Sequence, residues 1–137
     1  MVYVILKLLK FKMLKPETRT QISILNWLKL KHPNVYPYVI KIDNEGKRTK
    51  LGHVIAVKMG LQQGASDLFI AWPTSDYHGL FLEIKPDNWK KTKSNSAHYD
   101  RQLYFCEKMR KVGYFATVSI GVDACIKVVD KYLRGLL

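Results

Sequence analysis

Two acidic residues and one lysine stand at the ends of two apolar segments, where their spacing could support hydrolytic chemistry. Asp67 opens the segment DLFIAW, and Glu83 and Lys85 close the segment LFLEIK. If these segments pair as a β-hairpin centred near Ser75, Asp67 lies opposite Glu83, because each is eight residues from that centre. Glu83 and Lys85 then point to one face, since side chains alternate along a strand. Directly opposed residues have Cβ atoms about 5 Å apart.

Such a cluster suggests metal-assisted cleavage of a phosphodiester. Opposed carboxylates repel unless a cation lies between them, and Mg²⁺ binds one or two carboxylates while keeping waters and substrate phosphate oxygens. A metal held in this way offsets charge in the transition state and lowers the pKa of a bound water. Lys85 would orient or help deprotonate that water, or bind the scissile phosphate. The pattern D…ExK is short and frequent, so an ordinary surface ion-pair cluster stays an alternative on this motif alone.

The surrounding sequence predicts an α/β sandwich, in which a small mixed β-sheet is flanked by helices. Pro16 suits the first position of a helix that ends before Pro33, and Asp43 to Gly46 is typical of a turn. Strands are expected at 35–42, with Pro37 at an edge or strand start, and at 67–72, 80–85 and 114–120. A further helix is expected at 51–59, where Gly60 ends it. Another is expected at 94–112, capped by Ser94 to Ser96, and its apolar face would consist of Leu103, Cys106, Met109 and Val112. The last helix is expected at 123–133, capped by Asp123.

The charge balance predicts an anionic partner. The chain has 23 Lys and Arg residues against 11 Asp and Glu residues, a net charge of +12. In a protein this small, a net charge of that size causes strong self-repulsion, which an anionic partner relieves. Nucleic acid is the commonest anionic partner, and a membrane surface is the next. Simple solvation of the surface by lysines is the alternative. Cys106 and Cys125 are expected to be buried without a disulfide, which suits a reducing cytoplasm, and the histidines show no zinc-ligand spacing.

Residues 1–15 are expected to form a basic, apolar arm, and residues 16–137 a single domain. Lys7, Lys10 and Lys12 interrupt the apolar run far short of the roughly 20 residues that a membrane span needs. A signal peptide would need an uninterrupted apolar run and a small-residue cleavage site. We therefore expect no membrane partner, and a loose tail added by an upstream start codon is the alternative to a functional arm.

Two segments, Gly64–Ile70 and Tyr77–Lys85, closely resemble the virus-type replication-repair nuclease (VRR-NUC) domain of the PD-(D/E)xK superfamily. Other marks of that family follow in order over residues 16–134: Glu17 with Gln21 on a first helix, Asn44-Glu45-Gly46-Lys47-Arg48 after a strand, Gln102 on a late helix, and Gly113-Tyr114. Three positions depart from the family pattern. Ser66 replaces the proline that usually precedes the aspartate, and Asn44-Glu45-Gly46 replaces the commoner Asn-Gly-Gly turn. Tyr99 occupies a position that is often serine.

The resemblance implies a restriction-endonuclease-like core and cleavage of branched DNA with Mg²⁺ or Mn²⁺. It would make Asp67 and Glu83 metal ligands together with the backbone carbonyl of Ile84, and Glu17 would contribute directly or through a water. Lys85 would be the catalytic lysine, and Gln102 would help hold the site or the substrate. The resemblance implies that small stand-alone members, typical of phages and bacteria, act as homodimers on four-way (Holliday) junctions. Larger relatives contain a single embedded copy of the domain, which acts on flaps as a monomer.

Several residues have two interpretations. Gln102 lies on a helix with an apolar opposite face, so a solvent-facing glutamine is the default. Trp89 could stack on an unpaired base or cover the core. The basic residues expected to contact the DNA backbone are Lys47, Arg48, Lys90, Lys91 and Lys93, although a mobile surface turn would equally explain the first two.

Three functional hypotheses follow. The first is a homodimeric, structure-specific endonuclease for four-way junctions. The second keeps the enzyme and changes its substrate to a flap, a nick or plain duplex. The third is a DNA-binding module with the same fold but without catalytic activity. Loss of a metal-ligand residue would favour this hypothesis, but every site residue that the resemblance implies is present.

Overall fold

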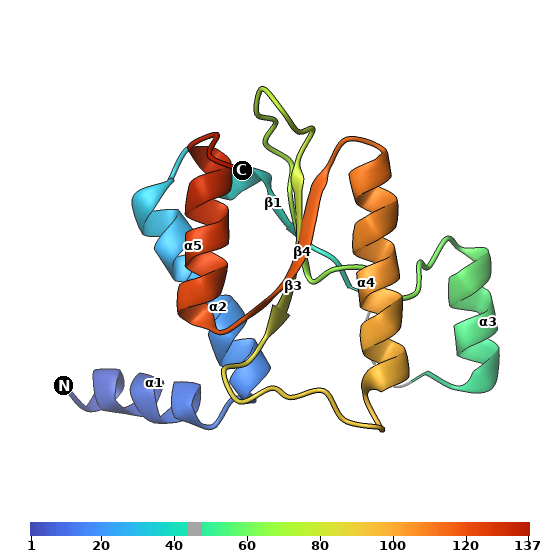
Figure 1. The fold of residues 1–137 in the computed structure, drawn as a ribbon. Helices are drawn as coiled ribbons and strands as arrows, with labels where there is room; N and C mark the ends of the chain where they lie inside the picture. The colour runs from blue at the N-terminus through green and yellow to red at the C-terminus, as the bar shows by residue number, and fades with distance from the viewer. Residues whose placement is uncertain (44–47) are drawn as a thin grey trace.

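The computed structural model describes residues 1–43 and 48–137, and it places helices on both sides of one four-stranded sheet (Figure 1). The strand order β1-β2-β3-β4 combines two antiparallel pairs, β1–β2 and β2–β3, with one parallel pair, β3–β4. The predicted α/β class with a small mixed sheet is therefore confirmed. Along the chain the elements are α1 (Val2–Lys12), α2 (Pro16–Lys31), the short 3₁₀ helix η1 (Tyr36–Tyr38), β1 (Val39–Lys41), α3 (Lys50–Lys58), β2 (Leu68–Ile70), β3 (Leu80–Lys85), α4 (Ser96–Lys111), β4 (Phe115–Ile120) and α5 (Val122–Leu133).

The two faces of the sheet carry different cores. Helices α2 and α5 cover one face and α4 covers the other, as the edge-on sheet in Figure 1 shows. The first face is largely aliphatic, where Ile24 and Leu28 of α2 pack with Ile84 of β3. The α4 face is aromatic, with the Phe81 ring centroid 5.4 Å from that of Phe105. Side chains alternate along β3, so Leu80, Leu82 and Ile84 face α2 and α5, and Phe81, Glu83 and Lys85 face α4.

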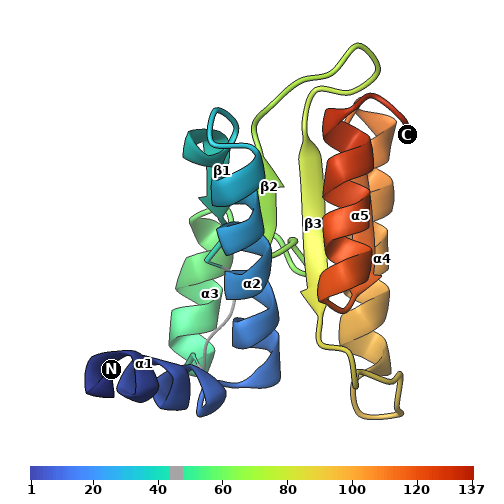
Figure 2. The same cartoon turned by 90° about the vertical axis from the view of Figure 1, so that its left-hand side faces the viewer.

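The register of the β2–β3 pair is the one that the hairpin argument predicts. Leu68 pairs with Leu82 and Ile70 with Leu80, and one step further along this register Asp67 lies opposite Glu83. β2 is shorter than the expected strand, because the chain leaves the ladder before Pro73, which has no N–H to donate. Residues 71–79 connect the two strands at the end opposite Asp67, as Figure 2 shows.

Helix α2 begins and ends where the sequence predicts. Pro16 occupies the first turn, Glu17 is the acidic residue of that turn, and basic residues fill the last turn before His32. Thr20, Ile24 and Leu28 are its buried residues. Their spacing of four residues forms one stripe that faces the sheet. Packing of this stripe fixes the position of Glu17 at one end of the sheet.

The start of the expected strand 35–42 is wrong. Residues 36–38 form η1, and the strand begins only at Val39. Pro37 has a fixed φ and no N–H, so it fits the first turn of a helical segment better than a hydrogen-bonded ladder. β1 is an edge strand of the sheet. The predicted turn at 43–46 lies largely outside the described residues.

The expected apolar face of α4 is right only at Cys106. The buried residues of the helix are Gln102, Phe105 and Cys106, while Leu103 and Val112 are 40% and 60% exposed. The helix is rotated because the polar Gln102 turns inward to meet Glu83. The predicted cap of α4 within Ser94 to Ser96 is confirmed in position, since Asn95 precedes the helix. The predicted cap of α5 is wrong, because Gly121 with its positive φ precedes that helix and Asp123 lies in its first turn.

Both cysteines are buried, as predicted, and both are free thiols. Cys125 belongs to the core between α5 and the sheet, and Cys106 lies on the sheet-facing side of α4. Burial raises the pKa of both thiols. A thiol with a raised pKa forms less of the reactive thiolate, so these cysteines act as small hydrophobic residues.

Helices α1 and α3 lie at the periphery in both views (Figures 1 and 2). None of their residues is buried. The α1 helix is shorter and more charged than a membrane span, and no helix in the described parts of the chain reaches the length and apolarity needed to cross a bilayer. The division into an arm at 1–15 and a domain at 16–137 stays a prediction.

Gly64 provides the sharpest stability prediction in the fold. Its φ is +75°, and a Cβ there would overlap the backbone carbonyl of Arg101 on α4. Gly64→Ala is therefore expected to lower the free energy of unfolding by about 3 kcal/mol, from a left-handed backbone cost and from overpacking.

Gly60→Ala is the matched control, because Gly60 also has a positive φ but no heavy atom within 4 Å of its Cβ position. It should cost only about 1 kcal/mol. Urea denaturation of both variants measures the difference, and equal losses would contradict the close packing at Gly64.

Candidate active site

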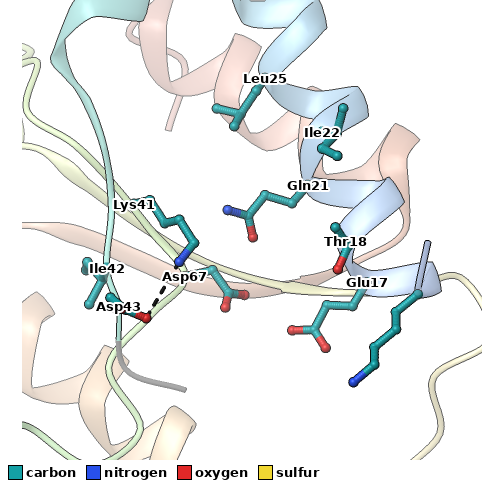
Figure 3. Close-up of a pocket in the computed structure, with 10 residues that line it drawn as sticks. Glu17, Thr18, Gln21, Ile22, Leu25, Lys41, Ile42, Asp43 and Asp67 are labelled. Carbon is teal, nitrogen blue, oxygen red and sulfur yellow. Dashed lines mark ion pairs between the residues drawn. The ribbon is translucent and has the colours of Figure 1, made fainter. Parts of the chain in front are cut away.

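Three carboxylates from distant parts of the sequence converge at one end of the sheet. Glu17 comes from the first turn of α2, Asp67 immediately precedes β2, and Glu83 lies in β3. Each offers one oxygen, and these oxygens all lie within 4.8 Å of one another. Figure 3 shows the side chains of Glu17 and Asp67 extending from opposite sides into a common space. Glu83 is 1% exposed, whereas the other two carboxylates are half-buried.

Asp67 is held by the backbone of the neighbouring strand. Its Oδ2 accepts a hydrogen bond of 2.7 Å from the backbone N–H of Ile84. In a hydrogen-bonded antiparallel pair, one residue's N–H and C=O both point to the same partner strand. The carbonyl of Ile84 therefore faces the edge on which Asp67 lies. This is the position that a backbone ligand to a metal shared with Asp67 would need.

Glu83 is enclosed by two donors. Its Oε1 accepts from Gln102 Nε2 at 2.6 Å and lies 3.4 Å from Lys85 Nζ. Lys85 is only 7% exposed, and its ammonium lies 5.4 Å from the ring centroid of Trp89. A buried ammonium needs such a carboxylate partner, because desolvation of a lone charge is costly. The pair therefore places the Lys85 side-chain nitrogen beside the carboxylate cluster.

Gln102 is not the solvent-facing residue that its helix pattern suggests. It is 2% exposed, and its Nε2 lies 2.6 Å from Glu83 Oε1 and 3.1 Å from His98 Nε2. The amide nitrogen can only donate, so we infer that His98 Nε2 accepts and that the His98 ring carries its proton on Nδ1. Sequence reasoning left His98 unassigned. Its position one helical turn before Gln102 is the signal that could have identified it.

The aromatic residue beside the lysine also packs within the protein. The ring of Trp89 is half-buried, with its centroid 4.9 Å from that of Tyr99 on α4. Tyr99, one of the departures from the expected family pattern, supplies this packing surface. Trp89 therefore forms part of the wall around the Lys85 ammonium; stacking on an unpaired base stays a prediction.

A cavity of about 460 Å³ opens beside the carboxylates (Figure 3). Glu17 and Gln21 line it from one face of α2, as their spacing predicts, and Asp67 lines it from the sheet. The sequence analysis missed two further lining residues, Lys41 and Asp43, whose charged groups lie 3.7 Å apart. No motif marks them, because they reach the cavity only through the pairing of β1 with β2.

One of the predicted DNA-binding residues, Lys47, lies outside the described residues. The others are exposed: Arg48, Lys90, Lys91 and Lys93. The 90–95 segment is held by the Asn95 side chain, which donates to the Lys90 carbonyl at 2.9 Å and accepts from the Thr92 N–H at 2.8 Å.

The donor set fits a hard divalent cation. Three carboxylates with oxygens inside 4.8 Å repel one another strongly, and a cation between them removes that repulsion. Carboxylate and carbonyl oxygens are the ligands that Mg²⁺ prefers and Mn²⁺ accepts. Among the described residues, this is the one group of three or more acidic, histidine or cysteine side chains close enough to share a metal.

Comparisons with known proteins agree with the geometry. No protein-family model matches the chain. No curated protein matches it either. A solved structure described as a VRR_NUC domain protein is similar, with a TM-score of 0.70 and 27% sequence identity over 88% of this chain and 89% of that one. The match confirms the restriction-endonuclease-like fold, and it supports the resemblance to the VRR-NUC domain that the motifs indicate.

Proposed function

We propose that this chain is a metal-dependent, structure-specific DNA endonuclease. The observation that supports it most strongly is the convergence of Glu17, Asp67 and Glu83, with the Lys85 ammonium 3.4 Å from Glu83. Three elements of the fold, α2, β2 and β3, must pack correctly to produce that arrangement. The net charge of +12 supplies attraction for a phosphate backbone. The chain would act inside the cell, where buried thiols stay reduced and DNA is present.

Each site residue has a proposed role. Asp67, Glu83 and the Ile84 carbonyl would hold Mg²⁺ or Mn²⁺, and Glu17 would complete the ligand set directly or through a water. When bound, the metal supplies an activated water and offsets charge on the scissile phosphate. Lys85 orients that water or the phosphate oxygen beside it. Gln102 fixes the carboxylate of Glu83 through its amide.

The preferred substrate is a four-way junction, cut by a homodimer. A two-fold dimer places two identical sites in symmetric positions, and a four-way junction offers two symmetric strands to nick. The exposed Arg48, Lys90, Lys91 and Lys93 would clamp the strands by charge without reading their sequence. A flap or nicked duplex is the alternative substrate for a single copy.

Cleavage of a substrate panel tests this proposal. Labelled four-way junction, 5′-flap, nicked duplex and plain duplex are incubated with the protein in Mg²⁺, Mn²⁺ or EDTA. We expect paired nicks in the junction, at least about tenfold faster than in duplex, and none in EDTA. Cutting of the flap alone would overturn the junction and dimer assignments. Binding without cutting in either metal would leave a DNA-binding module.

A further inference from the structure

A second hollow lies next to the carboxylate cluster and gathers positive charge. Its volume is about 300 Å³, and its polar walls are Arg48, His53, Gln63, His98 and Arg101. These residues come from three separate segments: α3 with the residues just before it, the loop before β2, and α4. The described lining residues include no carboxylate. The tertiary fold therefore brings these positive side chains together; they are not simply the exposed face of a single helix.

The hollow has a fixed shape on one side. The loop carrying Gln63 is held against α4 by the close approach of Gly64 to the backbone of Arg101. The next residue outward, Gln62, accepts a hydrogen bond of 2.9 Å from Lys108 Nζ on the same helix. These two contacts place the loop wall beside the Arg101 side chain. Like charges gathered on such a fixed frame repel, and an anion between them removes the repulsion.

The lining chemistry selects a phosphate. Arginine presents a planar fork of donors that matches phosphate oxygens, and it stays charged at any physiological pH. Arg48 and Arg101 both line the hollow, and the two histidines add further donors. A volume of about 300 Å³ has room for a phosphodiester.

One side chain links the hollow to the candidate active site. His98 is part of the hollow's wall, and its Nε2 lies 3.1 Å from Gln102 Nε2. The same amide nitrogen lies 2.6 Å from Glu83 Oε1. The hollow and the carboxylate cluster are thus separated by a single amide group.

We propose that this hollow binds the phosphodiester adjacent to the scissile bond on the same DNA strand. The inference rests on the proposed nuclease function and adds to it a second anchor point. Holding two consecutive phosphates sets the direction in which the strand crosses the carboxylates. The reacting phosphate would thereby be positioned over the carboxylates before hydrolysis.

Phosphate neutralisation combined with mutation tests the proposal. A series of junction oligonucleotides carries one uncharged methylphosphonate at each position around the cleavage site. Affinity is measured by fluorescence anisotropy without divalent metal, so that no cutting occurs. In the wild type, the methylphosphonate next to the scissile bond is expected to weaken binding about fivefold to tenfold. In the double variant Arg48→Ala/Arg101→Ala, the same substitution should change affinity less than about twofold, and the salt slope of binding should fall by about one or two.

The control double variant is Lys127→Ala/Lys131→Ala, which removes the same charge from exposed positions on α5. It should keep the wild-type interference pattern. An unchanged pattern in Arg48→Ala/Arg101→Ala would overturn the proposal, even if cleavage is normal. Loss of interference in a protein that never cuts DNA would keep the subsite and reject the nuclease function. Both arginines are exposed, so the variant should fold, and circular dichroism verifies it.

Discussion

Replacing Asp67 with asparagine is expected to reduce metal-dependent DNA cleavage by at least about 10³-fold while leaving the fold intact. Such a loss corresponds to about 4 kcal/mol of transition-state stabilisation. Asp67 lies at the point where the α2, β2 and β3 carboxylates converge. Removing its charge weakens metal binding and the activation of water together. Single-turnover cleavage of a labelled four-way junction in Mg²⁺ measures the effect.

The choice of asparagine separates chemistry from structure. Asp67 Oδ2 accepts the Ile84 N–H at 2.7 Å, and an asparagine carbonyl can accept the same hydrogen bond. The thermal stability of the variant should therefore stay close to that of the wild type. Asp43→Asn is the matched control, because Asp43 lines the same cavity but is exposed and paired with Lys41. Equal activity losses in both variants would contradict the assigned role of Asp67.

Mn²⁺ is expected to stabilise the protein in the absence of DNA, and Glu83→Gln should abolish this stabilisation. At a concentration 100 times Kd, a ligand that binds only the folded state contributes about 2.7 kcal/mol. For a chain of this size that is a rise in Tm of about 10 °C. The physical reason is the repulsion among the three carboxylates, which a divalent cation relieves. Differential scanning fluorimetry with and without Mn²⁺ measures the shift.

The Glu83→Gln variant keeps the volume of the side chain and can still accept from Gln102. It removes the carboxylate partner of the buried Lys85, so its metal-free Tm should be lower than that of the wild type, and the Mn²⁺ shift is measured from that baseline. Its Tm should rise by less than about 2 °C in Mn²⁺. Glu107→Gln, at an exposed position on α4, makes the same chemical change away from the cluster and should retain the full shift. A wild-type shift in Glu83→Gln would show that the cation binds elsewhere. This measurement is independent of any DNA substrate.

Local patterns were sufficient to predict the part of the site that lies within the hairpin. Alternation along the two strands and a turn-rich connection fix the register, so the position of Asp67 opposite Glu83 follows from the sequence alone. Helix α2 is equally predictable, because Pro16 and the residues before Pro33 mark its ends.

The residues that depend on tertiary packing could not be derived in this way. Glu17 joins the cluster because α2 docks on the sheet, and only the family resemblance indicated it. Gln102 looks solvent-facing on a helical projection, yet the carboxylate of Glu83 draws it inward and leaves Leu103 exposed. Periodicity assumes that the buried face of a helix is the apolar one, and a buried polar contact reverses that rule.

The hairpin connection 71–79 has a practical use that follows from its place in the fold. It lies at the end of β2 and β3 opposite the carboxylates (Figure 2). At its tip, the Thr74 N–H donates to the Tyr77 carbonyl at 2.9 Å, so the chain enters and leaves at nearly the same point. Ser75 and Asp76 between them are exposed. A fluorescent protein or affinity module with adjacent termini can be grafted between these two residues, because exposed loop tips are the sites that tolerate domain insertion. Such a fusion would report on DNA encounters while leaving the carboxylate end open.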